Sequence, residues 1–377
     1  MKIRKVSIWQ FSRRLDGKAW NPAFRWKERC APLIVVETEC GARGIGEAWS
    51  GYGKIEPVLR TLAREVAPAL IGRSFSSPES IHAEIFPHYA AAASREQAAA
   101  WSGVDIAIWD AMARTKGVPV WQLLNGASAL ARVYASGGLY RDDYSLDQLS
   151  AEFRGYKEAG FTSMKMKVCG LSVEEDVKRV QTVREALGDE PWLWIDAVNQ
   201  LTVESALEFW TRLAPFQVSG LQSPLSARDV LGLSALHAFG LPTIASEAEY
   251  KLTAFEHLLD AKAVLHLQFC LPLCGGFSGG AVLNERAAWA GISTTPQCFS
   301  TAIAQAATLN FAAGQPNVHS AEFHCYHDHL KDLFEKDVGT VSQGFATAGC
   351  DAGLGVRIPD VGVQGDGSVI SVYSEVR

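Results

Sequence analysis

The feature that most limits the possible folds is a series of short apolar runs, each ending in a polar residue, at intervals of 23 to 29 residues. The residues that end these runs are Lys167, Asp196, Gln222, Glu247, Cys270, Gln297 and Glu322. Each interval accommodates one strand, one helix and two short loops, and a further strand is expected at 132–136. Eight consecutive parallel β/α units predict a closed α/β barrel, whose strands present side chains at one common end.

Helical patterns lie between these strands. Residues 145–159 are expected to form one helix, and Ser172 with Glu175 forms a capping box at the start of another. Gly188 is expected to end that helix, and a third begins after Thr202. Each of these helices has one apolar face, so each needs a sheet to cover.

The chain before residue 126 has a different pattern. Residues 2–11 and 32–39 are strand-like, and helical spacing of apolar residues marks 57–70 and 97–115. This indicates an α+β unit. Residues 13–29, rich in aromatic and basic side chains, are expected to form a long loop that acts as a lid.

Composition favours a small-molecule ligand over a polymer. The chain has 377 residues, 48% of them hydrophobic, and a net charge of −6 without any block of basic residues. This argues against nucleic acid or an anionic membrane as partner. No run approaches the roughly 20 apolar residues of a membrane span, and the eight Cys show no C-x-x-C pairing. We therefore expect a soluble cytoplasmic protein with reduced thiols.

Lys165 and Lys167 are two residues apart on a predicted strand, so their side chains share one face. If that face is the barrel interior, a desolvated lysine beside another cation has its pKa lowered toward that of a working base. In the alternative arrangement, Met164 and Met166 point inward and both lysines are solvated.

Asp196 and Glu247 each follow a strongly apolar strand. Carboxylates at barrel strand ends are good ligands for a hard cation. Either residue alone could instead be a helix N-cap or part of an internal salt bridge. The two together are more informative, because both would project into the same mouth.

Several motifs of this chain together resemble those of one family. They are found at 35–47, with three glycines before Glu47, at 103–110 (GVDIAIWD), at 117–119 and 123–126, and at 160–167 (GFTSMKMK). On these motifs the chain resembles the enolase superfamily, in its mandelate racemase and muconate-lactonizing branch.

The resemblance implies a modified TIM barrel, (β/α)7β, at 126–340. It also implies an α+β capping domain at 1–125, completed by a C-terminal segment at 341–377. The chemistry implied is Mg²⁺-assisted removal of a proton α to a carboxylate, which gives an enediolate. The roles implied are Lys167 as base, Lys165 as its cationic neighbour, Glu322 in contact with the substrate, and Asp196, Gln222 and Glu247 as metal ligands.

Some positions depart from the family pattern. Gln222 stands where the second metal ligand should be Glu, and this weakens the expectation of Mg²⁺. The opposite acid/base positions hold Cys270 and Gln297; Cys270 could act only as a thiolate, and it is otherwise a small buried hydrophobe. Trp20, Trp26 and Tyr52 would lie over the mouth and contact substrate, or else form part of the cap core.

The sequence thus favours a lyase or isomerase, either a dehydratase or a cycloisomerase, that acts on a hydroxy acid or sugar acid. A racemase with two bases is disfavoured. The alternative is a degenerate relative with a lost or weakened Mg²⁺ site, which serves as a binding protein or in metal-free catalysis. The resemblance also implies a homo-oligomer, a dimer or an octamer.

Overall fold

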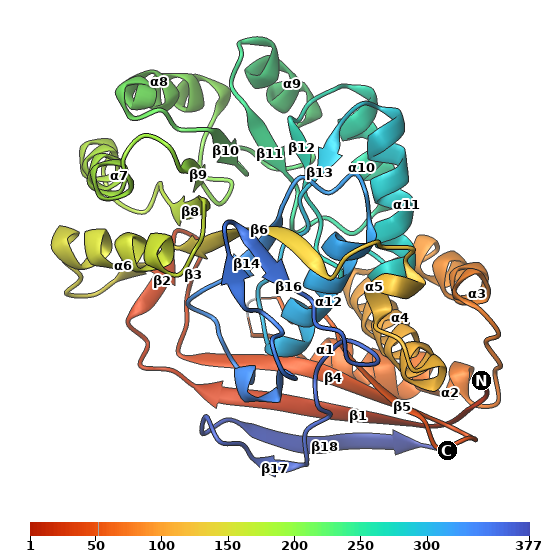
Figure 1. Cartoon of the computed structure of the whole chain (residues 1–377). Helices are drawn as coiled ribbons and strands as arrows, with labels where there is room; N and C mark the ends of the chain where they lie inside the picture. The colour runs from red at the N-terminus through yellow and green to blue at the C-terminus, as the bar shows by residue number, and fades with distance from the viewer. Residues whose placement is uncertain (52) are drawn as a thin grey trace.

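The computed structural model describes residues 1–51 and 53–377. Its centre is a barrel of eight parallel strands, in which β6 pairs with β14 and so closes the circle (Figure 1). A parallel bridge joins Thr294 of the seventh strand to Val318, just before the eighth strand begins. The barrel strands are β6 (Leu130–Gly137), β8 (Ser163–Lys167), β9 (Trp192–Asp196), β10 (Gly220–Gln222), β11 (Thr243–Ala245), β12 (His266–Leu267), β13 (Ser293–Thr294) and β14 (Ala321–His324).

Seven helices surround the barrel in the described part of the chain, one between each pair of successive strands (Figure 1). They are α6 (Leu146–Glu158), α7 (Val173–Leu187), α8 (Val203–Leu213), α9 (Val230–Ala238), α10 (Leu252–Asp260), α11 (Gly276–Trp289) and α12 (Ala302–Gly314). Capping boxes begin the first three of them, at Ser145, Ser172 and Thr202. The predicted (β/α)7β fold is confirmed.

The cap is built on a five-stranded sheet in the order β17, β18, β1, β4, β5. Its strands are β1 (Ile3–Arg14), β4 (Glu28–Thr38), β5 (Arg43–Glu47), β17 (Gly362–Val363) and β18 (Val369–Val376). Because β18 pairs with β1, the C-terminal tail completes the cap, as predicted. The first and last strands of the chain lie side by side (Figure 1).

Helices cover this sheet on the barrel side. They are α1 (Glu56–Thr61), a turn of π-helix (Leu62–Val66), α2 (Ala67–Leu70), α3 (Pro78–Ala90), α4 (Arg95–Lys116) and α5 (Val120–Leu123). Helix α3 was not expected from the sequence, although Ser77 and Ser80 form a capping box at its start. The domain boundaries given above stay a prediction; β15 (Val341–Ser342) and β16 (Phe345–Thr347) pair along the barrel strand β6 before the chain returns to the cap.

Helix α4 approaches the cap sheet closely because two glycines face each other. A Cβ on Gly46 would lie 2.1 Å from the carbonyl oxygen of Gly103, closer than any real contact. Asp110 on the same helix accepts hydrogen bonds from the backbone N–H of Ile45 and of Leu354, each at 2.8 Å. The motif at 103–110 therefore joins the helix to the sheet and to the C-terminal tail.

The prediction of a long loop at 13–29 is wrong in detail. β1 and β4 extend into it, and the remainder contains β2 (Ala19–Asn21) and β3 (Phe24–Arg25). Together with β7 (Tyr140–Arg141), from the barrel, these form a three-stranded sheet. Trp20 stacks on Tyr140 with ring centres 4.6 Å apart, so the aromatic residues fix this segment to the barrel.

No helix in residues 1–51 and 53–377 is both long and apolar enough to cross a membrane.

Candidate active site

The two lysines of β8 point into the barrel. Lys165 is 1% exposed and Lys167 7% exposed, while Met164 and Met166 pack in the hydrophobic core outside the barrel interior. The alternative in which both lysines are solvated is therefore wrong. Two buried ammonium groups need negative partners, since an unpaired buried charge is costly.

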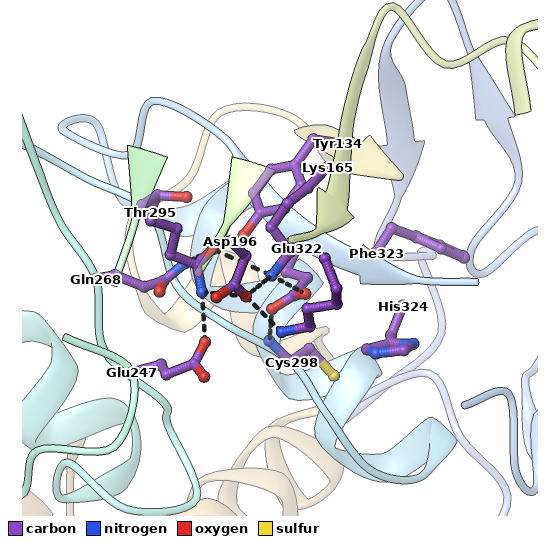
Figure 2. A network of polar contacts seen from close by, with 12 residues as sticks. Tyr134, Lys165, Asp196, Glu247, Gln268, Thr295, Cys298, Glu322, Phe323 and His324 are labelled. Atoms are coloured by element: carbon purple, nitrogen blue, oxygen red, sulfur yellow. Dashed lines mark hydrogen bonds and ion pairs between the residues drawn. The ribbon is translucent and has the colours of Figure 1, made fainter. Parts of the chain in front are cut away.

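Those partners are carboxylates from other strand ends. Lys165 Nζ lies 2.7 Å from Glu322 Oε1 and 3.4 Å from Asp196 Oδ2. Lys167 Nζ donates to the same Asp196 oxygen. Figure 2 shows Lys165, Asp196 and Glu322 converging at the end of the barrel. The lysines and acids thus form one buried ion-pair network.

This network changes the expected electrostatics of Lys165. Burial alone would lower the pKa of Lys165, but the negative charges of Glu322 and Asp196 outweigh burial and hold this pKa well above its usual range. The sequence-based expectation of a lowered pKa is therefore wrong for Lys165. Its ammonium stays charged, so Lys165 is suited to attract an anion rather than to accept a proton.

The pKa values of Asp196 and Glu247 are shifted in opposite directions. Burial opposes ionisation of Asp196, but Lys167 and Lys165 lower its pKa below the usual value. Burial, followed by repulsion from Asp196, raises the pKa of Glu247 to about 7. Asp196 is thus an ionised acid that both lysines contact, whereas protonation of Glu247 is favoured.

Gln222 lies between these acids. Its Nε2 donates to Asp196 Oδ2 at 3.0 Å and to Glu247 Oε2 at 2.5 Å. Its Oε1 accepts from Lys165 Nζ at 3.1 Å and from Gln268 Nε2 at 3.2 Å. The predicted ligands Asp196, Gln222 and Glu247 therefore do lie together, but an amide nitrogen faces the two carboxylates.

This arrangement does not fit Mg²⁺. The ion requires oxygen ligands at about 2.0–2.1 Å in nearly octahedral geometry, whereas Gln222 presents N–H groups to the space between Asp196 and Glu247. Within the described residues no group of three or more His, Cys, Asp or Glu side chains could hold a metal ion. The donor set is that of a hydrogen-bonded network.

A pocket opens between the barrel mouth and the cap, with about 530 Å³ of empty space including its open side. Of the lysine pair only Lys167 is among its lining residues; Lys165, Asp196 and Gln222 are buried and are not part of the lining. The lining residues are Asn21, Trp26, Trp49, Gly51, Leu139, Lys167, Glu247, Ala248, Gln297, Phe299, Glu322 and His324. A ligand in this pocket would meet the Lys167 amine.

The other expected site residues are placed differently. Trp26 and Gln297 line the pocket, whereas Trp20 lies against Tyr140 and is not part of the lining. Cys270 is buried in the hydrophobic core, and burial raises the pKa of its thiol well above the usual value, so it is no thiolate near neutral pH. Tyr52 lies outside the described residues.

Sequence reasoning missed His324 as a pocket residue. His324 follows Glu322 by two positions on β14, so both side chains share one face, and this spacing was the available signal. Burial, followed by the charges of Lys165 and Lys167, holds the pKa of His324 well below its usual value. Its Nδ1 accepts from the N–H of His327, so the neutral ring carries its proton on Nε2. No comparable pattern in the sequence indicated that Asn21, Trp49 and Phe299 would line the pocket.

Comparisons with known proteins identify the family. Residues 148–361 match the model of the family described as "Enolase C-terminal domain-like", and residues 26–125 match "Mandelate racemase / muconate lactonizing enzyme, N-terminal domain". The chain belongs to the enolase superfamily, in its mandelate racemase and muconate-lactonizing branch.

Relatives in this family include enzymes that act on sugar acids. The chain is 29% identical to the arabinonate dehydratase of Saccharolobus solfataricus over 86% of this chain and 87% of the relative. It is 28% identical to the D-galactarolactone cycloisomerase of Agrobacterium fabrum, over 95% and 97%. Dehydratases and cycloisomerases are thus both among its relatives.

A solved structure supports the fold. A racemase from Streptomyces coelicolor A3(2), with bound magnesium, superposes with a TM-score of 0.84 over 94% of this chain and 97% of that chain, at 22% identity. At this identity the likeness shows the fold alone. The relatives carry out several reactions, so membership of the family does not by itself choose among them.

Proposed function

We propose that this protein is an enzyme that removes the proton α to the carboxylate of a hydroxy acid or sugar acid, with Lys167 as the base, in a dehydration or a cycloisomerisation. The observation that carries the proposal is the position of Lys167. It is the one amine among the described residues that line the pocket, and it ends a buried strand at the barrel mouth. Sugar-acid dehydratases and cycloisomerases among the relatives support the same reaction class.

The surrounding residues suit this chemistry. For Lys167 to act as a base it must be the neutral amine, so its ammonium group first releases a proton to solvent through the open pocket, and its ion pair with Asp196 opens as it does so. The Cα–H bond then breaks, the proton moves to Lys167 Nζ, and the electron pair moves onto the substrate carboxylate. The nearby positive charge of Lys165 favours this enediolate.

In a dehydration, the β-carbon to oxygen bond then breaks. The proton held by Lys167 passes to the departing hydroxyl group, and water leaves. One base therefore serves both steps, if the proton and the hydroxyl group depart from the same face. In a cycloisomerisation the leaving group is the ring or lactone oxygen of the same molecule.

A racemase with two bases is less well supported. Racemisation needs a second acid/base on the opposite face of the substrate. The position expected for it holds Gln297, and the neighbouring Cys270 is buried with a raised pKa. Neither side chain exchanges protons readily near neutral pH.

The alternative is a binding protein that retains the fold without catalysis. The orientation of Gln222 favours this alternative, because it removes the cation that the family chemistry uses. An enzyme and a binding protein differ in one measurable event: only the enzyme exchanges the substrate's α-hydrogen with solvent.

The test is a screen of hydroxy acids and sugar acids in D₂O, followed by NMR for α-hydrogen exchange and product. We expect exchange and turnover with the unmodified protein and neither with Lys167→Ala. Lys178→Ala, an exposed lysine of α7, is the matched control and should retain full activity. Addition of a small primary amine should restore part of the exchange to Lys167→Ala.

Retention of α-hydrogen exchange by Lys167→Ala would refute Lys167 as the base. Binding of a sugar acid by the unmodified protein, detected by calorimetry but without exchange, would favour the binding-protein alternative.

A further inference from the structure

The amide of Gln222 holds two carboxylates together. Its Nε2 is 3.0 Å from Asp196 Oδ2 and 2.5 Å from Glu247 Oε2. A primary amide has two N–H donors, so both are used by these acids. Two buried carboxylates that would otherwise repel each other are thus joined by a neutral group.

Lys165 fixes the direction of this amide. Lys165 Nζ donates to Gln222 Oε1 at 3.1 Å, and Gln268 Nε2 donates to the same oxygen at 3.2 Å. An ammonium group has three donors and no acceptor. Reversal of the amide would turn an oxygen toward the acids, but it would also place the amide N–H groups against the ammonium group of Lys165. The orientation with nitrogen toward the acids is therefore strongly preferred.

One oxygen of Asp196 is crowded with donors. Its Oδ2 is contacted by Lys165, Lys167 and Gln222, and its Oδ1 accepts from the backbone N–H of Val198 at 3.1 Å. A carboxylate offers about four lone-pair positions. A cation at Oδ2 of Asp196 would therefore have to displace one of the two lysines or the amide.

We infer that the Gln222 amide replaces the divalent cation in this protein, and that its active site is organised without Mg²⁺. The amide bridges the two acids, and Lys165 supplies the positive charge that a substrate carboxylate requires. The catalytic part of this inference rests on the proposed function, whereas the part on metal affinity does not.

The affinity part is tested on the full chain after treatment with EDTA and removal of the chelator. Mg²⁺ binding is measured by calorimetry and Mn²⁺ binding by paramagnetic resonance for the unmodified protein, Gln222→Glu and Gln297→Glu. The last is the matched control, since it adds the same charge to the pocket lining but leaves the amide between Asp196 and Glu247 in place. We expect Gln222→Glu to bind at least about 10–100-fold more tightly than the other two.

Equal affinity of the unmodified protein and Gln222→Glu for Mg²⁺ would overturn the inference, and so would an equal gain in Gln297→Glu. If Gln222→Glu does not fold, thermal melting of the unmodified protein with and without Mg²⁺ tests the inference. Its melting temperature should not change with millimolar Mg²⁺, and a rise of several degrees would contradict a cation-free site.

The catalytic part is tested with the substrate that the screen identifies. Turnover by the unmodified protein should be the same with EDTA and with added Mg²⁺. Loss of turnover in EDTA that Mg²⁺ restores would overturn this part. Activity in Lys167→Ala would refute the proposed base and leave the metal titrations unaffected, so the two failures are distinguishable.

Discussion

Asp105 should make the stability of this protein depend on pH. This residue lies on cap helix α4, fully buried against the start of barrel helix α11, where its Oδ1 accepts from the N–H of Ser278 at 3.1 Å. Its Oδ2 has no hydrogen-bond partner among the described residues. Burial raises the pKa of Asp105 from 3.8 to about 7.

The raised pKa of Asp105 determines how the free energy of unfolding changes with pH. Between pH 4 and pH 7 the folded protein holds a proton on Asp105 that the unfolded chain has released, so the free energy of unfolding falls as the pH rises. At about 1.4 kcal/mol per pH unit, the full loss is about 4 kcal/mol by pH 8. Asp105→Asn carries no such proton and should lack this loss.

The assay is urea unfolding of the unmodified protein and Asp105→Asn at several pH values from 5 to 8. The difference in unfolding free energy between the two proteins removes the contribution of every other acid. We expect this difference to shift by about 2–4 kcal/mol in favour of Asp105→Asn across the range. Asp260→Asn, an exposed position of α10, should show no shift. A difference that is constant with pH would refute the reasoning.

Two further substitutions test the packing and the ion pairs. Gly46→Ala should destabilise the cap by about 1–3 kcal/mol or more, because its Cβ would lie 2.1 Å from the Gly103 oxygen. Gly155→Ala, on α6 with no atom near the added Cβ, should instead raise stability by about 1 kcal/mol. Thermal melting of the two variants and the unmodified protein measures both effects. Glu322→Gln removes the closest anion from Lys165, at 2.7 Å, and should cost about 3–5 kcal/mol as a broken buried pair. Unchanged melting of Glu322→Gln would show that Asp196 alone holds Lys165.

The barrel could be predicted because its signal is repeated along the chain. Each apolar run ends in a residue such as Lys167 or Asp196 at the same point of a strand, and the parallel register places those ends together. The lysine pair followed from the two-residue period of a strand. The closed barrel and most of the residues at its mouth could therefore be predicted from spacing, whereas the cap and the roles of the site residues were implied by the family resemblance.

Other features depend on contacts between distant segments. The small sheet of β2, β3 and β7 is made of strands of two or three residues, too short to show a period, and Trp20 finds Tyr140 only in the folded chain. The direction of the Gln222 amide depends on Lys165, 57 residues earlier. A sequence shows that Gln222 is neutral, but not which of its two ends faces the acids.

The pairing of β1 with β18 has a consequence for the order of folding. Lys5 on β1 contacts Glu375 on β18 across 370 residues of chain. As the polypeptide leaves the ribosome, the barrel strands can associate well before β18 is made, but the cap sheet lacks that strand until then. Contacts so far apart in sequence form slowly. The roof of the pocket should therefore be the last part of the molecule to mature, and nascent chains that stall before residue 369 should hold an open barrel.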